Sequence, residues 1–142
     1  TGTPTNSLLT TSAGVVIQGP LVAFGTYTPT LTGVSGVTAS TAYACQYLRV
    51  GNVVHVSGKV DIDPSITSGT GTLAITFPIA SAVPNDFQCG GTAVCGASFG
   101  MDGAIRADTV NDRAELLFTI AVGALADNES WYFTFTYLID NS

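Results

Sequence analysis

Residues 43–64 read YACQYLRVGNVVHVSGKVDIDP and decide the fold, because two alternating segments meet at the pair Gly51-Asn52. A glycine–asparagine pair between such segments is typical of the tight turn of a β-hairpin. Successive side chains of a strand point to opposite faces, so the second segment carries two distinct rows. The apolar row is predicted to lie in the core and consists of Val54, Val56, Val60 and Ile62. The mixed row is predicted to face solvent or a partner and consists of Val53, His55, Ser57, Lys59 and Asp61.

The remaining sequence repeats short apolar-rich segments separated by turn residues, and no window of the chain carries a clear helical stripe. Residues 131–139 are apolar on both faces, which predicts a central strand. Residues 115–122 are ambiguous, but Phe, Thr, Ile and Val dominate their second half and favour a strand. The sequence therefore predicts an all-β jelly-roll sandwich, with strands at 21–30, 42–50, 53–62, 72–78, 91–98, 104–109, 113–122 and 131–139.

The composition combines high hydrophobicity with few charges. Charged residues make up 10% of the 142 residues, against about 25% in an average soluble domain, while 46% are hydrophobic and the mean hydropathy is +0.40. Two explanations remain open: a neutral surface rich in Thr and Ser, or a homo-oligomer that covers part of the apolar surface. The net charge of −6 and the four cationic residues exclude nucleic acid and anionic membranes as partners.

The chain divides into two parts by composition. Residues 1–20 are rich in Thr, Gly and Ser, which predicts an extended lead-in that attaches the domain to whatever precedes it. Residues 21–142 are long enough for one domain with its own core.

No constellation of residues predicts catalysis, a metal site or a cofactor. His55 lies in mid-strand and no Gly-x-Ser-x-Gly motif presents a nucleophile. Asp61 and Asp63 are two residues apart, roughly 7 Å in an extended strand, but they point the same way instead of facing each other across a cleft. The sequence predicts a protein that is not an enzyme.

The three cysteines leave at least one thiol unpaired. We expect Cys45, Cys89 and Cys95 to be buried thiols of a protein folded in a reducing cytosol. A bridge between Cys89 and Cys95 is the alternative, and it requires a bend at Gly90-Gly91.

Two sets of residues are candidates for binding. The arginines, Arg49, Arg106 and Arg113, lie beside acidic turns or strand ends, so we expect most of them to pair internally, or one to receive a small anion. The aromatics contact either a glycan or a neighbouring subunit, with the core as the simplest alternative; they are Tyr27, Tyr43, Tyr47, Trp131 and Tyr132.

Several runs of the sequence resemble a known family of phage proteins: GTYTPTLT at 25–32, QYLRVGNVVHVSG at 46–58, SGKVDIDP at 57–64 and FPIAS at 77–81. Over about residues 21–140 the chain is similar to the C-terminal knob domain of tail needles and tail fibres of short-tailed bacteriophages. The resemblance implies a trimeric jelly roll, similar to tumour-necrosis-factor and adenovirus-knob domains, with residues 1–20 as the end of a shaft.

The same resemblance implies a function. The trimer would be the non-enzymatic tip of a needle or fibre, folded in the host cytoplasm and carried at the distal tail of the virion. It would cap the tail channel, join other tail proteins through the shaft, and contact or penetrate the bacterial cell envelope during adsorption and genome ejection. The alternative is a receptor-recognition domain that binds carbohydrate, such as lipopolysaccharide.

Overall fold

The computed structural model describes residues 9–10, 16–17, 22–96, 101–122 and 127–139. Within these ranges it consists of strands and one short 3-10 turn, η1 (Asp86–Gln88). No helix in the described ranges is long and apolar enough to cross a membrane. The strands are β1 (Leu9–Thr10), β2 (Val16–Ile17), β3 (Val22–Tyr27), β4 (Leu31–Ser35), β5 (Val37–Ala42), β6 (Cys45–Val50), β7 (Val53–Pro64), β8 (Gly69–Thr76), β9 (Cys89–Cys95), β10 (Asp102–Asp108), β11 (Arg113–Ile120) and β12 (Glu129–Leu138).

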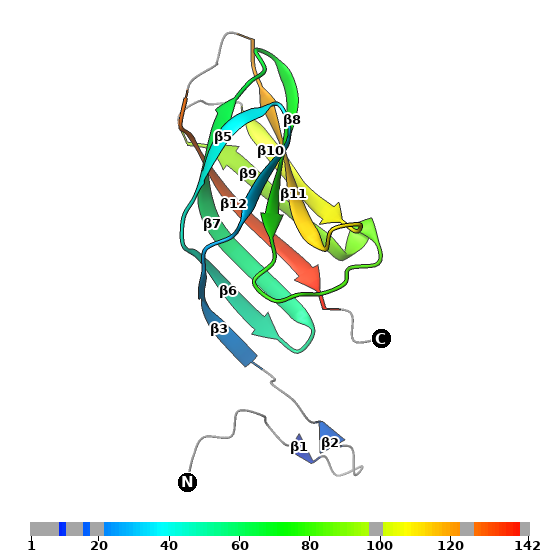
Figure 1. Ribbon diagram of the computed structural model, residues 1–142. Helices are drawn as coiled ribbons and strands as arrows, with labels where there is room; N and C mark the ends of the chain where they lie inside the picture. Colours follow the sequence, from blue (N-terminus) through cyan, green and yellow to red (C-terminus); the bar gives the residue numbers. More distant parts are fainter. Residues whose placement is uncertain (1–8, 11–15, 18–21, 97–100, 123–126, 140–142) are drawn as a thin grey trace.

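Ten of these strands form one antiparallel sheet, which confirms the predicted all-β class. Its strand order is β3-β6-β7-β12-β9-β10-β11-β8-β4, and β5 adds to β7. The long strand β7 pairs with β6 through its first half and with β5 through its second half. Figure 1 shows the result, a curled sheet in which β8, β11 and β5 lie in front of β7, β12 and β9.

The curl encloses a core of aromatic and branched side chains. Phe118 of β11 and Trp131 of β12 are not sheet neighbours, yet their ring centroids are 5.6 Å apart, so they meet across the interior. Along β12 the alternate residues Trp131, Phe133, Phe135 and Tyr137 are at most 3% exposed. Strand β12 lies between β7 and β9, which confirms the prediction of a central strand.

The hairpin predicted from residues 43–64 is present as β6 and β7, joined by Gly51-Asn52. Gly51 adopts a φ of 61°, a left-handed conformation that glycine takes without steric cost. The apolar row of β7 is completely buried, as predicted. The mixed row is exposed over its first half, but Asp61 is 8% exposed and belongs to the interior of a polar network.

Two strands were not predicted. Residues 31–42 hold many Thr, Ser and Gly residues and read as a loop between strands, but they form β4 and β5. Gly36, with a φ of 69°, joins them, so that β4 pairs with β8 while β5 pairs with β7. This segment thus connects the β8 end of the sheet with β7, and its pairing partners outweigh its weak local preference.

The predicted lead-in at 1–20 is described only at β1 and β2, which pair with each other. Its other residues lie outside the described part of the chain. The role of this segment as the end of a shaft stays a prediction.

Candidate functional site

The outward face of the sheet carries a row of polar side chains that crosses four strands. Gln46 lies opposite Ser57, Ser57 opposite Thr134, and Thr134 opposite Thr92. All four residues are exposed. Neighbouring strands are about 4.8 Å apart, so this polar row presents hydroxyl and amide groups at regular intervals across β6, β7, β12 and β9.

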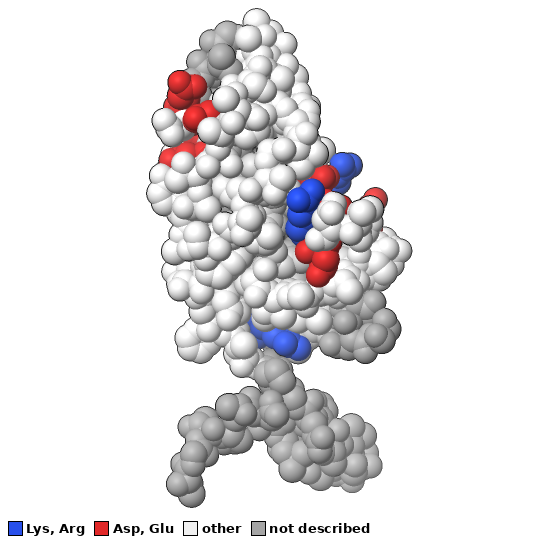
Figure 2. All heavy atoms as spheres, viewed as in Figure 1, with Lys and Arg blue, Asp and Glu red and all other residues white. Residues whose placement is uncertain are grey.

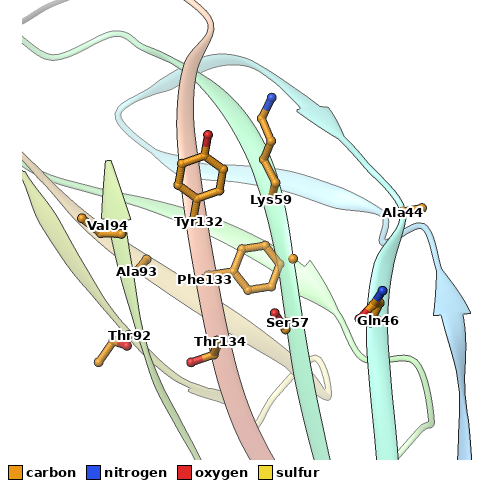
Figure 3. A pocket seen from close by; sticks show the side chains of 11 residues that line it. Ala44, Gln46, Ser57, Lys59, Thr92, Ala93, Val94, Tyr132, Phe133 and Thr134 are labelled. Carbon is orange, nitrogen blue, oxygen red and sulfur yellow. The ribbon is translucent and has the colours of Figure 1, made fainter. Parts of the chain in front are cut away.

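A second row of side chains runs beside the polar row. Lys59 lies opposite Tyr132, and Tyr132 lies opposite Val94. Half of the Tyr132 side chain is exposed. Figure 3 shows the two rows side by side, with Val94, Tyr132 and Lys59 in one and Thr92, Thr134, Ser57 and Gln46 in the other. Residues of both rows line a transverse groove of about 680 Å³.

One end of the transverse groove is fixed by a hydrogen-bonded network around Asp61. The Tyr43 hydroxyl donates to one carboxylate oxygen at 2.6 Å, and the Ser130 hydroxyl donates to the other at 2.8 Å. Lys59 forms an ion pair with Asp61 at 3.3 Å and lies 4.3 Å from the centre of the Tyr43 ring. The positive charge beside the groove is therefore already balanced.

The network sets the charge state of its members. Burial alone would raise the pKa of Asp61, but the hydrogen bonds from Tyr43, Ser130 and Lys59 outweigh burial and hold its pKa below the ordinary value. The hydrogen bond to Asp61 raises the pKa of Lys59. Both groups are ionised at neutral pH.

A separate apolar patch covers the end of the same outward face. Cross-strand pairing places Val22 beside Val50, Phe24 beside Leu48, and Val50 beside Val53. The exposed fractions are 59% for Val22, 80% for Phe24, 44% for Leu48, 54% for Val50 and 38% for Val53. Single exposed apolar residues are common, but a contiguous group of this kind is a candidate interaction surface.

The aromatic residues predicted to bind differ in their burial. Tyr27 and Tyr47 are partly buried against the core and meet edge to face, with centroids 6.2 Å apart. Trp131 is completely buried, so the expectation that it contacts a glycan or another subunit was wrong; it packs on Phe118 in the core. Tyr132, the next residue, points outward and borders the transverse groove.

Two of the three predicted arginines pair with carboxylates. Arg106 binds Glu115 at 2.9 Å, and Arg113 binds Asp108 at 2.7 Å. Arg49 donates through Nε to the carbonyl oxygen of Gly51 at 2.7 Å and bridges the hairpin turn. All three make structural contacts, and whether any of them also receives a small anion stays a prediction.

The side chains considered for catalysis form hydrogen bonds within the fold. His55 lies with Nδ1 3.0 Å from the Thr136 hydroxyl, across the β7–β12 pair. Asp63 accepts a hydrogen bond from the backbone N–H of Asn128. In the described part of the chain no group of three or more His, Cys, Asp or Glu residues could hold a metal ion.

The cysteines are buried thiols, as predicted, and none forms a disulfide. Cys89 and Cys95 stand at the two ends of β9. Six residue steps in a strand span roughly 20 Å, so the alternative Cys89–Cys95 bridge cannot form. The Cys95 thiol donates to Glu129 at 3.0 Å inside the core.

Comparison with known proteins gives a likeness of fold. No protein-family model matches the chain, and no curated protein matches it by sequence. Among solved structures it is similar to the attachment protein sigma1 of T1L reovirus, crystallised in complex with alpha-2,3-sialyllactose. The likeness has a TM-score of 0.51 at 14% identity and covers 93% of this chain and 75% of that chain. The chain therefore shares its fold with that protein.

The sequence did not reveal the groove or the apolar patch. Both lie across strands, and each depends on the register of several pairs that are far apart in sequence. The register of β6 and β7 was readable from Gly51-Asn52, and it places Gln46 beside Ser57 and Val50 beside Val53. No local signal, however, assigns Thr134 and Thr92 to the same row.

Proposed function

We propose that this chain is the head domain of a homotrimeric virion fibre, at the distal tip of a bacteriophage tail needle or tail fibre. In this role it is a structural, non-enzymatic protein that caps the fibre and contacts the bacterial cell envelope. The observation that carries the proposal is the apolar patch formed by Val22, Phe24, Leu48, Val50 and Val53.

The edge of the sheet supports an assembly of identical chains. Strand β3 is the last strand on its side of the sheet and reads VAFGTY, with no charge and no proline. Proteins usually protect such an edge with Lys, Pro or a covering segment, because its free backbone groups recruit other strands. A neighbouring copy of the chain would cover both this edge and the patch beside it.

The low charge of the surface fits the same assembly. Figure 2 shows acidic and basic side chains confined to small areas of an otherwise uncharged face. Several of these charges pair with each other, such as Arg106 with Glu115. The viral attachment fold and the resemblance of the sequence to phage knob domains support a place in the virion, with residues 1–20 leading to other tail proteins.

The assembly is tested by placing a charge in the patch. We expect Phe24→Asp to convert the trimer into a monomer in sedimentation experiments, because burying an unpaired carboxylate at an interface is costly. Phe87→Asp is the matched control, since Phe87 lies in η1 and is 83% exposed, against 80% for Phe24. Circular dichroism establishes that both variants stay folded. If both variants formed trimers to the same extent, the patch would not be the interface between subunits.

A second candidate function is recognition of a carbohydrate receptor such as lipopolysaccharide. The specific observation in its favour is the transverse groove with the half-exposed Tyr132 at its border. The sigma1 structure contains a sialylated glycan, which is a property of that protein and agrees with this candidate function. The two functions are compatible, because the patch and the groove occupy different parts of the outward face.

A further inference from the structure

We propose that the transverse groove between β6, β7, β12 and β9 binds a neutral oligosaccharide, with Tyr132 as the stacking surface and the polar row as the hydrogen-bonding surface. The inference rests on the second candidate function, recognition of a carbohydrate in this groove. It adds the chemical class of the ligand and the role of each row of side chains.

The size and shape of the groove fit an extended ligand of this kind. Its volume of about 680 Å³ lies within the range of small-molecule sites, roughly 300–1,000 Å³. It crosses the strands, so a ligand lying in it would meet Gln46, Ser57, Thr134 and Thr92 in turn. Hydroxyl groups both donate and accept hydrogen bonds, and the amide of Gln46 provides both functions as well. These are the complements of a sugar that presents hydroxyl groups along its length.

Tyr132 supplies the second kind of contact. Its ring is half exposed and borders the groove, and an aromatic ring packs well on the apolar C–H face of a sugar ring. A β-carbon on Gly96 would lie 2.5 Å from Cε2 of Tyr132, so the ring rests against the backbone at Gly96. The ring is therefore supported on one side and presented on the other.

The charges favour a neutral ligand over an acidic one. Lys59 is the only charged residue among those that line the groove in the described part of the chain. Its ammonium group already pairs with Asp61 at 3.3 Å and stacks on Tyr43. An acidic sugar or a phosphate would meet no unpaired cation there and would approach a chain of net charge −6.

The groove also differs from the surface assigned to subunit contact. The apolar patch presents valine, leucine and phenylalanine, whereas the polar row of the groove presents exposed hydroxyl and amide groups. Subunit contacts favour apolar surface at their centre, so a second copy fits the patch and a sugar fits the groove.

The test is an NMR titration of the full 142-residue chain with neutral oligosaccharides of glucose, galactose, mannose and rhamnose. Alpha-2,3-sialyllactose is the acidic arm of the same titration. We expect at least one neutral sugar to shift the amide signals of Ser57, Thr92 and Thr134. Tyr132→Ala should weaken that binding at least about tenfold, while Phe87→Ala, an exposed aromatic elsewhere, should leave it unchanged.

Three results would overturn the proposal: no neutral sugar shifts any signal, the shifts lie outside the groove, or only the sialylated sugar binds. A groove covered by a second copy would give the first of these results. The mass of the protein is measured on the same samples. If the protein is a trimer that binds no sugar, only the groove proposal fails. If it is a monomer that binds sugar in the groove, the proposal of a trimeric head fails and the groove proposal stands.

Discussion

Asp61 accepts a hydrogen bond from the Tyr43 hydroxyl at 2.6 Å, and this contact fastens the link between β5 and β6 to the second half of β7. Ser130 and Lys59 bind the same carboxylate. Two segments that are distant in sequence, those of Tyr43 and Ser130, thus meet β7 at one buried acid at the end of the groove.

This network makes stability depend on pH. The folded-state pKa of Asp61 is below its ordinary value of about 3.9, so its stabilising contribution is complete above that pH and is lost as the pH falls through the folded-state pKa. We expect the free energy of unfolding, measured by urea titration, to fall as the pH is lowered below about 4. Asp61→Asn should flatten this slope, and Asp102→Asn, at an exposed position, should not. Identical slopes in wild type and Asp61→Asn would contradict the account.

Gly58 is required because Cys45 occupies the space beside it. A β-carbon on Gly58 would lie 2.2 Å from the sulfur of Cys45. We expect Gly58→Ala to lower the free energy of unfolding by about 1–3 kcal/mol. Removing the sulfur should restore part of the loss, so the double variant Gly58→Ala, Cys45→Ala should lose less than the sum of the two single variants. Strict additivity in urea unfolding would show that the two residues do not compete for space.

Asp112 holds the segment before η1 against the core. Its carboxylate accepts backbone N–H groups of Ser81 at 3.0 Å and Val83 at 3.1 Å, around Ala82 with a φ of 53°. Asp112→Ala leaves these donors without their acceptor, and we expect a loss of about 1–3 kcal/mol in thermal or urea unfolding. Asp86→Ala, at an exposed position in η1, is the control and should change stability little. A loss of the same size in both variants would assign the effect to net charge.

The thiols should be unreactive in the folded protein. Burial raises the pKa of Cys89 to about 12 and also raises the pKa of Cys45, so little reactive thiolate forms near neutral pH. We expect iodoacetamide to leave the native chain unmodified and to label all three cysteines after unfolding in urea, as read by mass spectrometry. Rapid labelling of the native protein, or incomplete labelling of the unfolded chain, would contradict this result.

The sequence predicted the elements whose register is local. Alternation in β7 and β12 gave the buried rows, and Gly51-Asn52 gave the turn that aligns β6 with β7. It failed at β4 and β5, where Thr, Ser and Gly have weak preferences and the pairing with β8 and β7 decides the structure. Trp131 and Tyr132 show the same limit for the site: both are aromatic, and only their parity on β12 separates a core residue from a groove residue.

The central claim, that the chain forms the trimeric head of a fibre through its apolar patch, is tested most directly by the mass of the protein in solution. Sedimentation equilibrium of the full chain at micromolar concentration should give the mass of three chains of 14.5 kDa each. A mass of 14.5 kDa under these conditions, with the chain folded, would contradict the claim.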